Sequence, residues 1–216
     1  MKRYTHVIWD FNGTVYNDVD ACIRSANRLL TAHGLMPFST VTEYRERFGF
    51  PIIDYYRRMG FDFDVTPYDE LAVEWVDYYM EETRSAHLYD GFLPAWEFFR
   101  DNGLVQILLS ATEREMLSGQ LELLGVRGCF DEILGQDTIH AYGKRELGVA
   151  WSAAHPDAVP ILIGDTEHDA EVARAMGADC ILLACGHRPS AALKQCGALA
   201  VAEDHPSLLC LFFREC

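Results

Sequence analysis

Residues 5–14 of the chain read Thr-His-Val-Ile-Trp-Asp-Phe-Asn-Gly-Thr, and this stretch decides the fold. The apolar run at 5–9 ends in Asp10 and is followed by Asn12-Gly13, which is the pattern of a buried parallel strand entering a tight turn. The glycine lets the backbone pass closely around a bound anion, and Asp10 presents a carboxylate at the strand end. The stretch alone also fits an aspartate that only caps the turn.

The same pattern of an apolar run followed by small or polar residues returns three times. The runs at 104–109, 160–163 and 178–183 end at Ser110, at Gly164-Asp165 and at Ala184, and weaker strand signals lie at 131–134 and 199–201. Helical patterns separate them at 113–124, 144–154 and 167–176, the last stopped by Gly177 as a C-cap. Alternating strands and helices predict an α/β fold with a doubly wound parallel sheet, whose ligands bind outside the carboxyl ends of the strands.

One interval, from 18 to 86, carries helical patterns and no convincing strand. Apolar residues at helical spacing predict a first helix with Asn17 as its N-cap. Further helices are expected at 42–48, at 52–59 and around 71–79. We therefore expect an all-helical cap domain at 17–87, inserted into a core domain made of 1–16 and 88–216. Because the insert leaves directly after the first strand, it can lie over the strand ends as a lid.

A second cluster of acidic residues follows the strand at 160–163. Asp165 lies at the strand end, and Asp169 lies on the first turn of the next helix. Hard oxygen ligands of this kind suit Mg²⁺, although acidic residues are also favourable at a helix N-terminus without any metal. Each cluster alone fits a structural role, but two clusters at the ends of parallel strands favour a metal-assisted site.

The charge balance limits the partners of the protein. The formal net charge is -15 at pH 7, whereas binding to nucleic acid or to anionic membranes needs clustered Lys and Arg, so we expect a small substrate. The only lysines are Lys2, Lys144 and Lys194, and a lysine that opens a helix gains nothing from the helix dipole, which makes Lys144 a candidate functional residue. No stretch approaches the roughly 20 apolar residues of a membrane span, and we expect a cytoplasmic protein.

In these motifs the chain resembles the haloacid dehalogenase superfamily, and in particular its phosphoglycolate-phosphatase-like branch. The resemblance covers nearly the whole length, and the helical insert lies where that branch carries its cap. The matching motifs, in order, are Asp10-Phe11-Asn12-Gly13-Thr14, Leu109-Ser110-Ala111-Thr112, Gly143-Lys144, and Gly164-Asp165-Thr166 with Asp169.

The resemblance implies a nucleophile and a metal. Asp10 would attack phosphorus and form an aspartyl-phosphate that water later hydrolyses. Mg²⁺ would be held by Asp10, by the backbone carbonyl of Asn12 and by Asp165, with Asp169 acting directly or through water. The substrate would be a small phosphorylated metabolite, and the protein a monomer or homodimer.

The resemblance also implies how the phosphate is bound. Ser110 and the amide of Ala111 would bind its oxygens at a helix N-terminus, together with Gly13 and Thr14 of the first loop. Lys144 would neutralise the nucleophile and the phosphoryl group in transfer.

The chain departs from the family pattern at Asn12. Phosphatases of the superfamily usually carry an aspartate there as the acid that protonates the leaving group, and an amide cannot deliver a proton. General acid catalysis contributes roughly 10²–10⁴ in rate. Three interpretations follow. The first is a phosphatase that tolerates Asn12, either by acting on an acyl, aryl or otherwise activated phosphate or by using an acid from the cap or the substrate. The second is a hydrolase with other chemistry, such as a metal-independent dehalogenase, and the third is a phosphate-binding module with little or no catalysis.

Two of the other chemistries are disfavoured by the residues themselves. Hydrolases of this superfamily that form a Schiff base use a cap lysine, and no lysine lies between Lys2 and Lys144. A metal-independent dehalogenase would have no need of Asp165 and Asp169. Cap arginines could pair with a carboxylate or second phosphate of the substrate, and Arg47 is favoured for its place beside residues 48–51.

Overall fold

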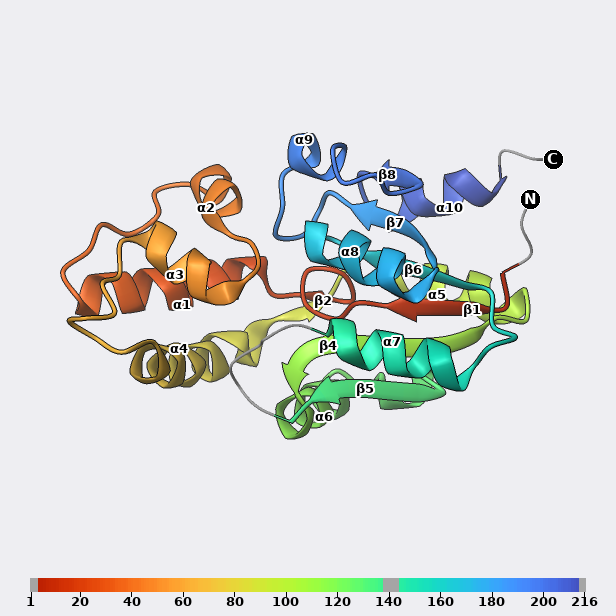
Figure 1. The fold of residues 1–216 in the computed structure, drawn as a ribbon, viewed down its shortest axis with the longest axis horizontal. Helices are drawn as coiled ribbons and strands as arrows, with labels where there is room; N and C mark the ends of the chain where they lie inside the picture. Colours follow the sequence, from red (N-terminus) through yellow and green to blue (C-terminus); the bar gives the residue numbers. More distant parts are fainter. Residues whose placement is uncertain (1–3, 138–143, 214–216) are drawn as a thin grey trace.

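A six-stranded sheet forms the centre of the molecule in a computed structural model that describes residues 4–137 and 144–213 (Figure 1). The strand order is β5-β4-β1-β6-β7-β8, and all neighbouring strands are parallel. The strands are β1 (His6–Trp9), β4 (Val105–Glu113), β5 (Glu132–Gln136), β6 (Pro160–Gly164), β7 (Asp179–Leu183) and β8 (Ala200–Ala202). The predicted α/β fold class is confirmed.

Helices cover both faces of this sheet, and the alternation of side chains along β1 separates the two cores. Val7 and Trp9 lie in the core under α5 (Phe92–Asp101), α6 (Arg114–Leu123) and α10 (His205–Phe213). Ile8 lies in the opposite core, under α7 (Arg145–Ala154), α8 (Glu167–Met176) and α9 (Ser190–Leu193). Because both faces are covered, β1 is apolar along its length, as its sequence indicated.

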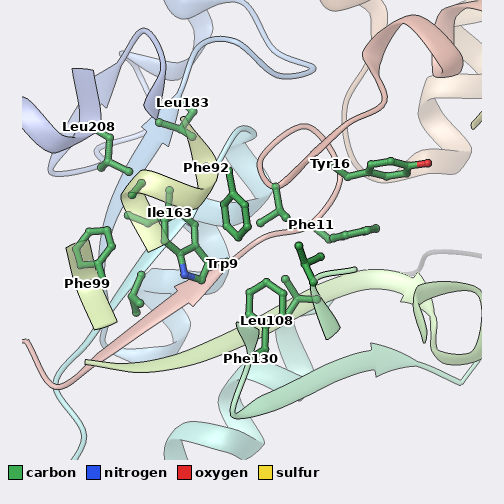
Figure 2. Close-up of a cluster of buried hydrophobic side chains, with 14 of the residues drawn as sticks. Trp9, Phe11, Tyr16, Phe92, Phe99, Leu108, Phe130, Ile163, Leu183 and Leu208 are labelled. Carbon is green, nitrogen blue, oxygen red and sulfur yellow. The ribbon is translucent and has the colours of Figure 1, made fainter. Parts of the chain in front are cut away.

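Trp9 anchors the end of β1 in the first of these cores. Its ring meets Phe92 and Phe99 edge-on at centroid distances of 5.4 and 5.6 Å, and Figure 2 shows both rings beside it. Its indole Nε1 donates to Oε1 of the buried Gln106 at 2.7 Å, so the polar atom is satisfied. The residue that follows, Asp10, is therefore held by a rigid strand end.

Four helices form the insertion between β1 and β4 and lie together at one side of the sheet (Figure 1). They are α1 (Val19–Ala32), α2 (Val41–Arg47), α3 (Ile52–Met59) and α4 (Tyr68–Glu82), followed by a 3-10 turn at Thr83–Ser85. Their buried apolar side chains form a core of their own. The two connections to the sheet run side by side, because β2 (Tyr16–Asn17) pairs antiparallel with β3 (His87–Leu88).

The helical insertion is the predicted cap, while its division from the core at 17–87 stays a prediction. The predicted N-cap of α1 is wrong by one residue: Asn17 pairs in β2, and Asp18 is the N-cap. Helices α5, α9 and α10 were not predicted, and in α10 the apolar residues are too crowded to show one clear stripe. Among the described residues, no helix has the length and apolar character that a membrane span requires.

The position of the sheet core predicts that two leucine-to-alanine substitutions change the free energy of unfolding by very different amounts. Leu108 is fully buried in β4, so Leu108→Ala should lower the free energy of unfolding by about 3 kcal/mol. Leu123→Ala, at a position that is 67% exposed on α6, should change it by less than about 0.5 kcal/mol. Urea denaturation of both variants measures this, and equal losses would contradict the assigned core.

Candidate active site

Three carboxylates predicted to act together meet at the carboxyl ends of β1 and β6. Asp10 follows β1, Asp165 follows β6, and Asp169 lies on the first turn of α8. All three are buried, and one oxygen from each lies within 4.8 Å of the others. Strand β1 lies where the strand order reverses, which is the place where doubly wound sheets bind ligands.

Lys144 joins this cluster from the N-cap position of α7. Its side chain is buried, and its ammonium group pairs with Asp10 and, at 2.6 Å, with Asp169. It also donates to the carbonyl oxygen of Leu109 at 3.1 Å. Burial alone would lower the pKa of Lys144, but the carboxylates of Asp10 and Asp169 raise it above its usual value, so this lysine stays cationic.

The negative charge that Lys144 leaves unbalanced is large for a buried site. Burial raises the pKa of Asp10 to about 6, with Lys144 opposing the shift and Asp169 adding to it. Burial likewise raises the pKa of Asp165 well above its usual range. For Asp169, Lys144 outweighs burial and lowers the pKa. One lysine therefore does not balance three carboxylates, and the site favours a further cation.

The oxygen donors present fit Mg²⁺, which prefers carboxylates with room left for phosphate and water. Asp165 is aimed by the amide of His187, which donates to Oδ2 at 2.6 Å, and by the Thr14 hydroxyl at 3.4 Å. Asp169 is less free to bind a metal, because its Oδ2 already accepts hydrogen bonds from the amide and hydroxyl of Thr166 at 3.0 and 2.7 Å. Asp10 and Asp165 are thus the side chains most able to bind a metal directly.

The turn after β1 brings Gly13 and Thr14 into the site, as predicted. Gly13 has φ 73°, and a Cβ atom there would overlap the Asp165 carboxylate, so only glycine fits. The Thr14 hydroxyl is buried and lies 3.5 Å from the Asp10 carboxylate. The turn is closed by the carbonyl of Phe11, which accepts hydrogen bonds from the amides of Thr14, Val15 and Tyr16.

Asn12 is held by a network that only an amide satisfies. Its Nδ2 donates to Asp18 and to the Tyr79 hydroxyl, both at 2.7 Å, and its Oδ1 accepts from Thr112 at 2.7 Å. An ionised aspartate at this position would place two carboxylate oxygens in contact. The residue that departs from the family pattern is therefore matched to its neighbour Asp18.

Asp18 is fully buried and forms the centre of that network. It also accepts from the amide of Gly13 at 3.0 Å and from the Tyr79 hydroxyl at 2.8 Å, and His187 Nε2 lies 3.2 Å away. Burial opposes ionisation of Asp18, but His187 and the hydrogen bonds from Asn12 and Tyr79 bring its pKa below its usual value. Asp18 is thus an ionised, fully hydrogen-bonded carboxylate beside the reaction site.

Ser110 and Ala111 line a cavity that Asp10, Asp165 and Asp169 also line, but they do not lie at a helix N-terminus as predicted. Strand β4 continues to Glu113, and α6 begins only at Arg114, so Ser110 does not lie at a helix N-terminus. The free amides of that terminus are capped by the Glu113 side chain. The Ser110 Oγ accepts from the amide of Thr112 at 3.1 Å, which leaves its own proton to donate.

Arg47 lies outside the cavity that the other predicted residues line. Its guanidinium pairs with Glu43 at 2.9 Å and lies over the ring of Phe38 at 5.6 Å. Three other cap arginines are also engaged: Arg45 with the carbonyl of Cys185, Arg57 with Asp54, and Arg58 with the carbonyls of Arg47 and Gly49. The position of Arg47 gives no support to its predicted role.

The loop after β7 docks the cap over the strand ends. The Tyr44 hydroxyl lies 2.8 Å from Nδ1 of His187, and Arg188 donates to the carbonyls of Arg45 and Phe48 at 2.7 and 2.5 Å. Arg188 also pairs with Glu167 on the core at 2.5 Å. Residues from both parts of the chain therefore enclose the site.

Sequence reasoning missed Asp18 and His187. Asp18 lies next to the predicted N-cap Asn17, and His187 follows a strand without a recognised motif. The one available signal was Gly186-His187, which begins three residues after the apolar strand ends at Leu183: a Cβ atom at Gly186 would overlap Asp165. Glycine at a strand end next to a carboxylate marks a close approach of the backbone.

The family model for haloacid dehalogenase-like hydrolases matches residues 7–183. A search of curated proteins found no match. Among solved structures, a haloacid dehalogenase-like family hydrolase from Streptococcus pneumoniae has a TM-score of 0.82 at 20% identity, covering 98% of this chain and 100% of that one.

Two further structures share the fold. A predicted phosphatase from Clostridium acetobutylicum has a TM-score of 0.76 at 19% identity, covering 97% and 98% of the two chains. A predicted phosphoglycolate phosphatase from Haemophilus somnus has a TM-score of 0.75 at 16% identity, covering 98% and 99%. Because the family model spans most of the chain, the protein belongs to the haloacid dehalogenase-like hydrolase family.

Proposed function

We propose that the protein is a Mg²⁺-dependent phosphatase that hydrolyses a small phosphorylated metabolite through an aspartyl-phosphate on Asp10. The observation that carries the proposal is the pairing of Asp10 with the cationic Lys144, beside the buried carboxylates of Asp165 and Asp169. Fold relatives described as predicted phosphatases support it. We also propose a cytoplasmic location, with the chain acting as a monomer or homodimer.

Asp10, Asp165 and the backbone carbonyl of Asn12 would hold the metal. Bound Mg²⁺ would neutralise phosphate oxygens and lower the barrier to attack by an anionic nucleophile. Asp169 is engaged by Lys144 and Thr166, so it would reach the ion through water.

The chain's own groups would carry the two chemical steps. An Asp10 oxygen would bond to phosphorus while the bond from phosphorus to the leaving oxygen breaks. Lys144 would pair with the phosphoryl oxygens, and the Ser110 hydroxyl and Ala111 amide would donate to them. Water would then cleave the aspartyl-phosphate and release inorganic phosphate, which restores the Asp10 carboxylate.

The two alternatives explain less of the site. A metal-independent dehalogenase would have no use for three buried carboxylates that one lysine does not balance. A module that only binds phosphate would not need an attacking carboxylate beside a neutralising lysine. Halide release without metal would favour the first alternative, and phosphate binding without turnover would favour the second.

Metal binding should depend on pH through Asp10 and Asp165. Their folded pKa values are raised, Asp10 to about 6, so at pH 5 the metal must displace protons from the site. The apparent affinity for Mg²⁺ should therefore rise as pH increases through 6. Calorimetry in two buffers of different ionisation enthalpy measures the released protons. Affinity that is constant from pH 5 to 8 would rule out these ligands.

Loss of the nucleophile should abolish turnover while the fold survives. We expect Asp10→Asn to lower kcat by at least about 10³-fold, because an amide does not attack phosphorus. Asp157→Asn, at an exposed position, serves as the matched control and should retain wild-type activity. Acid-quenched wild-type protein should carry one hydroxylamine-sensitive phosphate by mass spectrometry. A phosphorylated Asp10→Asn protein would show that another residue is the nucleophile.

Exchanging Asn12 and Asp18 should restore the missing acid. Asn12→Asp alone creates contact between two carboxylates, whereas Asn12→Asp with Asp18→Asn keeps one amide and one carboxyl group at the 2.7 Å contact. The double variant should hydrolyse glycerol 3-phosphate about 10²-fold faster, since alkyl leaving groups need a proton. Its rate on 4-nitrophenyl phosphate should change less than about threefold. Asp18→Asn alone is the control, and equal changes on both substrates would contradict this role of Asn12.

A further inference from the structure

A cavity of about 150 Å³ lies over the carboxylates, and aromatic cap side chains form much of its lining. The aromatic residues come from the segment before α3 and from α3 and α4: Phe48, Phe50, Tyr55, Tyr56, Tyr68, Trp75 and Tyr79. Asp10 and Lys144 line the same cavity. A substrate whose phosphate meets Asp10 would therefore place its organic part among these rings.

Apart from Lys144, the described lining offers no lysine or arginine to a second anionic group. Among the described residues, Lys144 is the only lysine or arginine that lines the cavity, and the sequence at 138–143 contains neither type. Two further carboxylates, Asp18 and Glu113, do line it. A substrate carboxylate or second phosphate would be buried without a partner and close to negative charge, which is strongly unfavourable.

The two histidines of the lining are already engaged. His187 lies between the Tyr44 hydroxyl and Asp18, with one contact at each ring nitrogen. His168 accepts from the amide of Lys144 at 3.3 Å and stacks on Phe50 at a centroid distance of 4.6 Å.

Two neutral hydrogen-bond donors in the lining have no partner among the described residues. They are the hydroxyl of Tyr55, a residue only 3% exposed, and the indole Nε1 of Trp75. Buried donors normally find an acceptor, so an acceptor is the group that these two side chains lack. An uncharged acceptor on a flat ring, such as a carbonyl or ether oxygen, suits such a lining.

Asn12 points to the same class of substrate from the chemical side. Without an acid to protonate it, the leaving oxygen must depart as a stable anion, and a phenolate does so far more easily than an alkoxide. We infer that the substrate is an aryl phosphate whose organic part carries no charge, and this inference rests on the proposed phosphatase activity. The phosphorus-to-aryl-oxygen bond breaks as the Asp10 bond forms, and the phenolate takes its proton from water.

Two aryl phosphates separate recognition from reactivity once the acidity of their leaving groups is taken into account. A line of log kcat/KM against leaving-group pKa, measured with Mg²⁺ on aryl phosphates without a charged substituent, sets the rate expected from reactivity alone. On that line 4-acetylphenyl phosphate should fall, whereas 4-carboxyphenyl phosphate should lie at least about tenfold below it, because only the second carries an extra charge. Acetyl phosphate, a small activated phosphate, reports the phosphatase activity independently. A value for 4-carboxyphenyl phosphate on or above the line would overturn the inference.

A charge placed in the lining tests whether the cavity sets this preference. Val76 lines the cavity, whereas Val73 on the same helix is 49% exposed and is absent from the lining. Val76→Lys should shift the ratio of kcat/KM toward 4-carboxyphenyl phosphate by about tenfold, and Val73→Lys should leave the ratio unchanged. The same shift in both variants would overturn the inference, and the wild-type comparison stands even if Val76→Lys does not fold.

Failure of the function and failure of the inference give different results. Hydrolysis of acetyl phosphate with higher kcat/KM on phosphoglycolate or phosphocholine than on the aryl phosphates would overturn the aryl inference and leave the phosphatase intact. No Mg²⁺-dependent turnover of any compound, acetyl phosphate included, would overturn both.

Discussion

The structure depends on the balance of charge where β1 and β6 end. Asp10, Asp165 and Asp169 are buried together, and only Lys144 among their contacts is a permanent cation. A rigid sheet makes this crowding possible, since the Trp9 and Ile163 backbones pair directly before the two strand-end carboxylates. Holding these like charges together lowers the stability of the fold. Such arrangements are common where a site must bind a cation and a phosphate.

A hydrogen bond between Asn12 and Asp18 connects the loop after β1 to the cap. Asp18 opens α1 and accepts hydrogen bonds from Asn12, from the loop amide of Gly13 and from Tyr79 of α4. The buried carboxylate therefore fixes the loop and the cap in one arrangement. It also explains why an amide is present at position 12, where a second carboxylate would face it without a proton to share.

The sequence predicted the sheet and the clustered carboxylates because both follow from local patterns. Apolar runs that end in Asp10 and Asp165 specify parallel strands whose carboxyl ends must meet, and the shortage of lysines singled out Lys144. Tertiary contacts were beyond that reasoning. The pairing of Asn17 in β2, the extension of β4 past Ser110 and the approach of His187 to Asp18 all depend on residues far apart in the chain. Arg47 was favoured for its nearness to a loop, yet Glu43 one turn earlier holds it.

The cap has a core of its own but is joined to the strand ends by contacts of several kinds. Its buried apolar residues pack among themselves, so the four helices form one unit. Tyr44 hydrogen-bonds with His187, and Arg188 donates to cap carbonyls, while Phe48 contacts the His187 ring at a centroid distance of 4.8 Å. The paired links β2 and β3 keep the two connections side by side. The cap therefore holds its aromatic side chains over the strand ends, and under the proposed function it would enclose the organic part of a substrate while the core supplies the groups that contact phosphate.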